Sequence, residues 1–373
     1  MKRCLPLAWS LAVLPVVGTE AQIVIDYGND AFFNADTEVS RLAREAVEQA
    51  AADLNAYIDF DLAPIGRDTF SGTVAGSNVT FTGSIASTPQ FTTDGGDPVF
   101  VEVPLSEIGR NELRIFVSGD VLPFGTLGIG GPAQFRFTNR WTEDDTPGAF
   151  DAAFDAAVTD FNTALSRGGS GPTIFSVERS LADRPQSVYP LSAGPLGGNI
   201  RINLDAGGDG EISGDSELRN YFSFDANAPV EPGTVDFYTN ALHEMIHTLG
   251  FGNAVTWFDQ IDGNDWTGEN VVALLGQDNN LIRRSDQNHI RSNASSFIVG
   301  TDILQEVVMD PTQSFNERKL LTELDLAFIA DLGYAVRGVN TPIPEPATAG
   351  VLGLSAGVLL LGRRRRHAAT VRA

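Results

Sequence analysis

Residues 234–253 read TVDFYTNALHEMIHTLGFGN. Apolar side chains recur in this stretch near the helical period, which predicts a helix over residues 235–249. Thr234 is placed to cap the first free amides, and Asp236 falls in the first turn, where a carboxylate complements the helix dipole. Gly250 supplies the positive-φ position at which a helix usually ends. The predicted helix therefore has a defined start and a defined end.

Two histidines and a glutamate on this helix have the spacing of a metal-dependent hydrolase. His243 and His247 lie four residues apart, so both imidazoles reach the same ion from one side of the helix. Neutral imidazoles bind Zn²⁺, and the carboxylate of Glu244 would take the proton of an attacking water. This is the H-E-x-x-H zinc-hydrolase pattern. The alternative is a chance match on an amphipathic helix, with packed or solvated histidines.

The number of histidines favours the metal site. The chain has only four. One of them, His367, lies in a tail that we expect to be removed, and His289 is the only one left besides the helical pair. Three protein ligands are what a catalytic zinc site needs.

The stretch resembles the metzincin clan of zinc metalloproteases, whose extended motif reads H-E-x-x-H-x-x-G-x-x-H and is followed by a methionine-bearing turn. The matching residues are His243, Glu244, His247 and Gly250. Asn253 stands at the third-ligand position, where a neutral amide is a poor zinc ligand. The leishmanolysin-like branch carries a long insertion there, and this layout implies His289 as the third ligand and Met309 as the Met-turn residue. Asn253 or Asp259 is the alternative ligand, and the alternative for Met309 is core filler.

The resemblance implies an α+β fold for residues 22–337. A two-lobed protease domain of this clan has an N-terminal lobe with a mixed β-sheet, the active-site helix, and a mostly helical C-terminal lobe. Residues 199–204 alternate apolar and polar side chains like a half-buried strand. By analogy with the clan, this could be the edge strand that pairs with an extended substrate.

Other segments have clear patterns of their own. One-sided apolar periodicity predicts helices over residues 37–56 and 149–165. A third helix is expected over residues 322–332, where Thr322 and Asp325 have the capping-box spacing. Short alternating segments punctuated by Gly, Pro and Asp make residues 59–138 β-rich.

An acidic loop follows residue 204 and reads DAGGDGEISGDSE. Asp205, Asp209 and Glu211 have spacings reminiscent of a calcium-binding loop. The match is incomplete, because Gly207 replaces a ligand and Ser216 stands where a bidentate glutamate belongs. A solvated acidic loop is the alternative to a Ca²⁺ site.

Both ends of the chain look like sorting signals. Residues 1–21 have the basic start, short apolar run and small-residue end of a secretory signal peptide, and they contain Cys4, the only cysteine. Residues 338–373 are a linker followed by a segment that resembles the PEP-CTERM signal of bacteria that make extracellular polysaccharide, with PEP at 344–346, an apolar run and an arginine cluster. The resemblance implies exosortase-like sorting machinery as a partner and only transient membrane contact. A plain C-terminal membrane anchor is the alternative.

The charge balance is strongly acidic. The formal net charge is −23, and loss of residues 1–21 and 347–373 would remove seven basic residues and one acidic residue, giving −29. Nucleic acid is therefore not an expected partner. Export implies an extracellular or cell-surface location, in the biofilm matrix of a Gram-negative-type bacterium.

Together these patterns predict a secreted zinc metalloendopeptidase that acts on a protein or peptide substrate. Two alternatives stay open. The chain could be an extracellular matrix or surface protein that keeps the fold and has lost the chemistry, or a zinc hydrolase of a non-peptide amide.

Overall fold

The computed structural model describes most of the chain between residues 22 and 338. The described ranges are 22–73, 80–92, 98–123, 125–132, 135–141, 149–181, 184–283 and 286–338. The chain separates into two units, Met1–Val339 and Asn340–Ala373, and all described residues belong to the first. The leader expected at 1–21 lies outside the described ranges, as does all but the first residue of the sorting segment expected at 338–373. No helix within those ranges is long and apolar enough to span a membrane.

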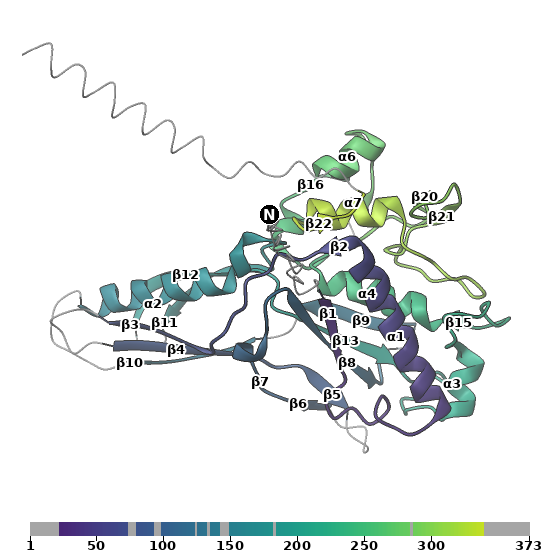
Figure 1. Ribbon diagram of the computed structural model, residues 1–373, viewed down its shortest axis with the longest axis horizontal. Coiled ribbons are helices and arrows are strands. Elements are labelled where there is room, and N and C mark those ends of the chain that lie inside the picture. The colour runs from purple at the N-terminus through teal and green to yellow at the C-terminus, as the bar shows by residue number, and fades with distance from the viewer. Residues whose placement is uncertain are drawn as a thin grey trace, which may run out of the picture. The chain divides into compact units, whose positions relative to one another are not determined.

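The described part is a mixed α+β structure of seven α-helices and several small sheets (Figure 1). This confirms the α+β part of the expected fold. The helices are α1 (Glu38–Tyr57), α2 (Ala149–Leu165), α3 (Asp215–Tyr221), α4 (Phe237–Thr248), α5 (Val255–Phe258), α6 (Glu269–Leu275) and α7 (Glu323–Asp331), with short 3-10 helices η1 (Leu105–Glu107) and η2 (Arg167–Gly169).

A four-stranded sheet lies beside α4. Its strands, in order across the sheet, are β1 (Gln22–Asp26), β8 (Glu112–Asp120), β13 (Gly198–Asn203) and β9 (Gly128–Pro132). The first three are parallel, and β9 is antiparallel to β13. The expectation that residues 199–204 form an edge strand is wrong, because β13 pairs with β8 on one side and β9 on the other. The edge belongs to β9, whose sequence GIGGP lacks the alternation that predicts a strand.

Residues 59–138 are rich in strands, as predicted. The strands of this region and the hairpin beyond it are β3 (Thr69–Thr73), β4 (Thr80–Ser87), β5 (Gln90–Thr92), β6 (Pro98–Phe100), β7 (Val103–Pro104), β10 (Phe135–Trp141), β11 (Phe175–Leu181) and β12 (Arg184–Ala193). β4 pairs with β3, β10 and β7. Helix α2 packs against β3 and β12 over a core of its own that includes Phe70, Phe154 and Phe161.

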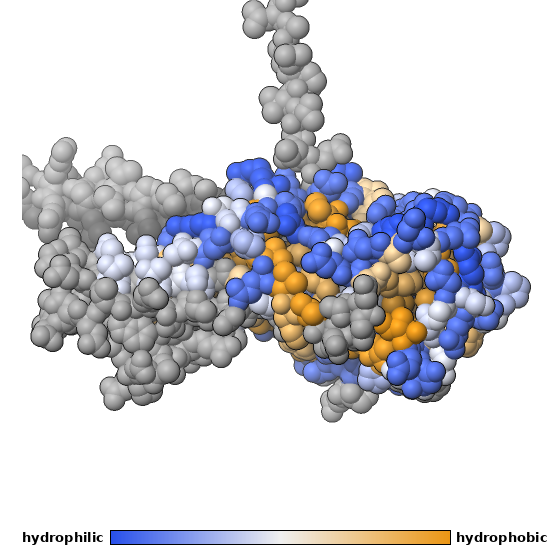
Figure 2. All heavy atoms as spheres, turned by 90° about the horizontal axis from the view of Figure 1, so that it is seen from below, coloured by the Kyte–Doolittle hydropathy of each residue, from blue (hydrophilic) through white to orange (hydrophobic). Residues whose placement is uncertain are grey.

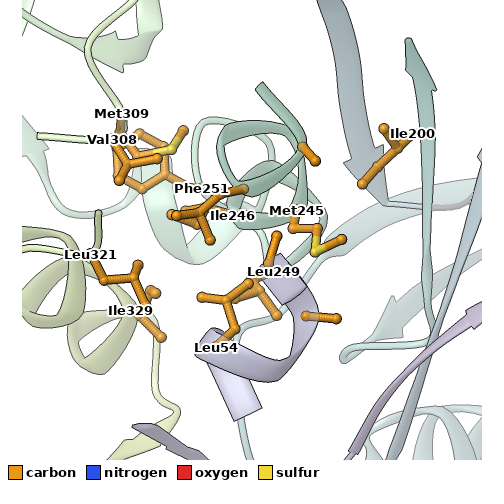
Figure 3. Packing of buried hydrophobic residues seen from close by; sticks show 14 of the residues in the cluster. Leu54, Ile200, Met245, Ile246, Leu249, Phe251, Val308, Met309, Leu321 and Ile329 are labelled. Atoms are coloured by element: carbon orange, nitrogen blue, oxygen red, sulfur yellow. The ribbon is translucent and has the colours of Figure 1, made fainter. Parts of the chain in front are cut away.

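Helix α1 begins one residue after its N-cap, Thr37. The hydroxyl of Thr37 accepts the N–H of Ser40 at 3.1 Å. Its apolar face is buried and packs against α4. Figure 3 shows Leu54 of α1 next to Leu249 at the end of α4.

Helix α4 runs through the main hydrophobic core. Every one of its residues except His243 is buried, which is typical of a helix covered on all sides. In Figure 3, Met245 points toward Ile200 of β13, whereas Leu321 and Ile329 lie on the opposite side of the helix. The sheet, α1 and the C-terminal part of the chain therefore together fix the position of α4.

The part after residue 250 is less helical than expected. Besides three short helices it contains three hairpins, formed by β16 (Ile261–Asp262) with β17 (Asp265–Trp266), β18 (Ile282–Arg283) with β19 (Asp286–Ile290), and β20 (Ser295–Phe297) with β21 (Leu304–Glu306). Its many Gly, Asn and Asp residues favour turns over long helices. Two further pairs join distant segments, β14 (Phe222–Ser223) with β15 (Val235–Asp236) and β2 (Ile58–Asp59) with β22 (Ala335–Val336).

Helix α7 has the predicted capping box. The side chain of Thr322 accepts from the Asp325 amide, and the side chain of Asp325 accepts from the Thr322 amide.

The surface of the molecule is not uniformly polar, since the face in Figure 2 exposes hydrophobic areas between polar side chains. Exposed large apolar residues include Phe100 of β6 and Ile129 of β9. The acidic composition therefore leaves some apolar surface in contact with solvent.

Candidate metal centre

Helix α4 begins two residues later than the sequence predicted. Residues 235–236 form strand β15 instead, because they pair with β14. Asp236 is the N-cap and accepts the N–H of Thr239 at 3.0 Å, whereas the Thr234 hydroxyl donates to a carbonyl before the helix. Arg318 pairs with the buried carboxylate of Asp236 at 2.7 Å. The start of the helix is therefore fixed by a residue from the C-terminal part of the chain.

Three histidines converge at one point. His243 and His247 come from one side of α4, and His289 comes from β19. The Nε2 atom of His247 lies 3.2 Å from Nε2 of His243 and 3.2 Å from Nε2 of His289. Within the described part of the chain, this is the one group of at least three His, Cys, Asp or Glu side chains that could hold a metal ion.

The other nitrogen of each ring is hydrogen-bonded to an oxygen atom. The Nδ1 distances are 2.8 Å from His243 to Val308 O, 2.8 Å from His247 to Phe251 O, and 2.9 Å from His289 to Asp286 Oδ2. A carbonyl oxygen only accepts, so in the first two rings Nδ1 carries the proton. Their Nε2 atoms then present lone pairs to one another with no proton between them. A cation at the centre would relieve this arrangement.

The donor set can hold a metal ion, and three imidazoles are donors that Zn²⁺ takes. A tetrahedral ion with Zn–N bonds of about 2.0–2.1 Å holds its nitrogens about 3.3 Å apart, close to the observed 3.2 Å. Burial lowers the pKa of His243 to about 4. Burial, together with the neighbouring His243, also holds the pKa of His247 well below its usual value. Both rings are therefore neutral near pH 7, which is the form that binds a metal.

Neither alternative third ligand belongs to this cluster. Asp259 is exposed at the end of α5 and is not part of the group. The Asn253 side chain donates to Phe251 O at 3.2 Å. The third imidazole of the cluster is that of His289.

Two contacts bring β19 to the end of α4. The indole N–H of Trp257 donates to Gln287 O at 2.8 Å. Gly252 has a φ of +70°, and a Cβ added there would lie 2.2 Å from Asn288 O. The glycine therefore serves both the end of the helix and the close approach of the strand that carries His289.

The turn expected at Met309 is present. Val308 and Met309 form it, and Met309 is fully buried. The contact with the histidines is made by the neighbouring carbonyl, Val308 O, which accepts from His243. On the other side, the Asp325 carboxylate accepts the N–H groups of Val308 and Met309 at 3.2 and 3.4 Å. The N-cap region of α7 therefore supports the turn.

Glu244 is buried beside the histidines, with 6% of its surface exposed. Burial raises the pKa of its carboxyl group to about 8, although the Gly130 N–H donates to it and acts in the opposite direction. A Cβ on Gly128 would lie 2.9 Å from Glu244 Oε1, and one on Gly130 would lie 2.2 Å from Glu244 O. The glycines of β9 therefore allow the strand to lie directly against the glutamate.

A cleft of about 450 Å³ opens beside these residues. Its walls come from residues 125–128, from α4, and from the segment after the Met309 turn; both His243 and Glu244 line it. The Asn240 side chain donates to Leu127 O at 3.1 Å and ties two of these walls together. His243, His289 and Glu244 thus line one cavity next to the start of β9.

The acidic loop does not form a comparable cluster. Both carboxylate oxygens of Asp205 accept backbone N–H groups within the loop, and Asp209 accepts the N–H of Glu211 at 3.0 Å. The three carboxylates expected at a calcium site are not brought together as a metal-binding group. The loop carboxylates stabilise their own turns instead.

Several residues of the site were not found by sequence reasoning. Asp286, Gly128, Gly130 and Lys319 all contact the histidines or Glu244 or line their cleft. Asp286 stands three residues before His289, a local signal that could have been used. Gly128, Gly130 and Lys319 are distant in sequence from the histidines and come close to the site only in the folded protein.

Comparison with known proteins gave no match, whether with protein-family models, with curated sequences or with solved structures. The function therefore has to be argued from the residues of the site themselves.

Proposed function

We propose that the protein is an exported zinc-dependent metalloendopeptidase. The observation that carries this proposal is the convergence of three imidazole Nε2 atoms beside a buried glutamate in an open cleft. Each part has a chemical use in peptide hydrolysis. No other described group of side chains offers a metal site.

The three histidines and Glu244 have different roles in this proposal. His243, His247 and His289 would hold Zn²⁺, which when bound would acidify a water molecule and polarise the scissile carbonyl. Glu244 accepts the proton of the attacking water and returns it to the leaving amine. Burial raises the pKa of this carboxyl group to about 8 in the metal-free protein, and a bound cation would favour the ionised form that accepts the proton.

The two-lobed arrangement of the metzincin clan is part of the proposal. The Met309 turn below α4 and the distant third histidine support it. The outer edge of β9, which has no strand partner within the described part of the chain and lies beside Glu244, also supports it, because an extended peptide adds to an open strand edge through backbone hydrogen bonds. We therefore propose β9, in place of β13, as the strand that binds substrate.

Export and sorting rest on the sequence of the two ends. The signal-peptide pattern and the PEP-CTERM-like pattern support passage out of a Gram-negative-type cell, with an exosortase-like enzyme as partner. The extracellular biofilm matrix or the cell surface is the location that we propose.

The test is mass spectrometry of an unfolded protein substrate incubated with the purified protein. We expect cleavage at internal peptide bonds, loss of cleavage with a zinc chelator, and recovery when zinc is restored. A protein that binds zinc but cuts no peptide would favour a hydrolase of another amide. One that neither binds zinc nor cuts would be a matrix protein that has lost the chemistry.

A further inference from the structure

Lys319 stands out in composition and in burial. The chain has 25 lysine and arginine residues, and Lys319 is the only lysine after Lys2. It is also 1% exposed and lines the cleft that His243 and Glu244 line. A chain that uses arginine almost everywhere else thus places one buried ammonium group at the candidate site.

The ammonium group joins two points of the chain that lie on either side of the Met309 turn. Its Nζ atom is 3.1 Å from a carboxylate oxygen of Glu306, at the end of β21. It also donates to Thr312 O at 2.9 Å. Because the turn residues Val308 and Met309 lie between these partners, Lys319 closes the base of the loop that carries them.

The backbone of Lys319 is attached to the start of α4. Its N–H donates to the Thr239 hydroxyl at 2.8 Å, and that hydroxyl donates to the N-cap carboxylate of Asp236 at 2.7 Å. The next residue, Leu320, exchanges two hydrogen bonds with the side chain of Gln305. Lys319 therefore links the start of α4, which carries His243 and His247, to the Met309 turn, whose Val308 carbonyl binds the ring of His243.

We propose that Lys319 is a positioning residue, which clamps the Met309 turn between Glu306 and Thr312 and thereby fixes the ring of His243. The link to the ring is Val308 O, which accepts from His243 Nδ1 at 2.8 Å. Asp325 holds the amides of the same turn from α7. Asp325 thus holds the amides of the turn, and Lys319 holds the residues on either side of it, Glu306 and Thr312.

The surroundings of Lys319 explain why this residue is not an arginine. Its ammonium is a compact point charge, whereas a guanidinium is a larger planar group with a fixed fork of donors. At 1% exposure the side chain is enclosed, and its two partners, Glu306 and Thr312 O, are placed to receive a single ammonium group at 3.1 and 2.9 Å. We therefore expect Lys319→Arg to fail as a replacement, although it keeps the charge.

The pair is also sensitive to loss of either partner. Removing one member of a buried ion pair leaves a charge without compensation, and this is more disruptive than the loss of the contact alone. Glu306 is half-buried at 29% side-chain exposure, so Glu306→Gln is the milder change. The two substitutions should not be additive if both act through the same clamp.

The experiment compares Lys319→Met, Glu306→Gln, the double variant and a control, Arg219→Met, in the full chain. Arg219 forms an exposed pair with Glu38 that joins α3 to α1, away from the turn. The first measurement is hydrogen exchange of residues 306–313 in the metal-free protein, which depends on no activity. The second is the absorption spectrum of bound Co²⁺, with the zinc dissociation constant.

We expect Lys319→Met to speed exchange over residues 306–313, to change the Co²⁺ spectrum, and to weaken zinc binding by about 10–100-fold, as other losses of support around metal ligands do. The double variant should be no worse than Lys319→Met, and Arg219→Met should resemble the wild type. Unchanged exchange and an unchanged Co²⁺ spectrum in Lys319→Met would overturn the proposal. If that variant does not fold, the same two readouts in Glu306→Gln decide.

This inference concerns the site of the proposed function, but the two fail separately. A wild-type protein that cuts no peptide would contradict the peptidase and leave the exchange measurement meaningful. Normal exchange in the Lys319 and Glu306 variants would contradict the clamp even in an active peptidase.

Discussion

Each histidine of the cluster depends on the oxygen atom that holds its Nδ1 atom. For two of the rings this is a backbone carbonyl, and for His289 it is the carboxylate of Asp286. A carboxylate in this position orients the ring and raises the basicity of Nε2. A single side chain outside the H-E-x-x-H pattern is therefore expected to set part of the metal affinity.

We predict that Asp286→Asn weakens zinc binding by about 10–100-fold. An asparagine keeps an oxygen acceptor but removes the negative charge beside the ring. The zinc dissociation constant, measured by competition with a chelator, checks this. Asp262→Asn, an exposed change on the β16 hairpin, is the control, and equal affinities in the two variants would contradict the role of Asp286.

The glycines of β9 give a second prediction at this scale. Gly128→Ala should lower kcat by roughly 100-fold while zinc content is unchanged, because the new Cβ would lie 2.8 Å from Glu244 Cγ and 2.9 Å from Oε1 and would displace the carboxylate. Gly131→Ala is the matched control on the same strand, since its Cβ would meet nothing closer than 3.6 Å. Full activity in Gly128→Ala would show that β9 does not position the glutamate.

At the scale of elements, the insertion after α4 is held by one acidic side chain of α7. The carboxylate of Asp331 accepts the backbone N–H groups of Asn270 and Val271 at the start of α6, at 2.8 and 3.1 Å, and the indole N–H of Trp266 at 2.9 Å. Helix α6 has no side-chain cap of its own. Asp331 therefore caps α6 from a different element.

We predict that Asp331→Ala lowers the free energy of unfolding by about 1–3 kcal/mol, because it leaves buried donors without an acceptor. Urea unfolding followed by fluorescence measures this. Asp278→Ala changes an exposed carboxylate of the same insertion and should stay near the wild type. If both variants were equally stable, α6 would not depend on the remote cap.

The elements that could be predicted are those with local signals. Helices α1, α2 and α7 follow from apolar periodicity and, for α7, from the capping-box spacing of Thr322 and Asp325. β9 could not be predicted, because its sequence, with three glycines, shows no alternation of apolar and polar side chains. Its glycines are explained only by the close approach of Glu244 in the folded structure. The start of α4 was misplaced because its first residues pair with β14, a partner distant in sequence.

The candidate site divides in the same way. His243, Glu244 and His247 lie close together on one helix and could be predicted from their spacing alone. His289 was predicted from the number of histidines and from the clan resemblance. Its place in the cluster is confirmed. Lys319 could not be assigned a role from sequence, because both of its partners are reached only after the chain has folded.

At the scale of the whole molecule, burial of Glu244 links the metal site to stability. The pKa of this group is about 8 in the folded metal-free protein, which therefore keeps the proton up to about pH 8, whereas an unfolded chain loses it near the ordinary pKa of 4.5. Between these values the folded state binds more protons, so the contribution of Glu244 to stability falls as pH rises.

We therefore predict that metal-free Glu244→Gln becomes progressively more stable than the metal-free wild type between about pH 5 and about pH 8. The expected gain is several kcal/mol, from about 1.4 kcal/mol per pKa unit. Urea unfolding in the presence of a chelator measures it. A difference that does not change with pH would contradict the raised pKa, and saturating zinc should reduce the difference because a cation favours the ionised carboxylate.

The most direct test of the central claim is the rate at which the wild type and Glu244→Gln cut the same unfolded protein, with each preparation shown to carry equal zinc. The account predicts cleavage by the wild type and a loss of at least about 100-fold in the variant, because general-base catalysis contributes typically 10²–10⁴-fold. Equal rates at equal zinc content would show that Glu244 is not the base, and the proposed peptidase mechanism would have to be abandoned.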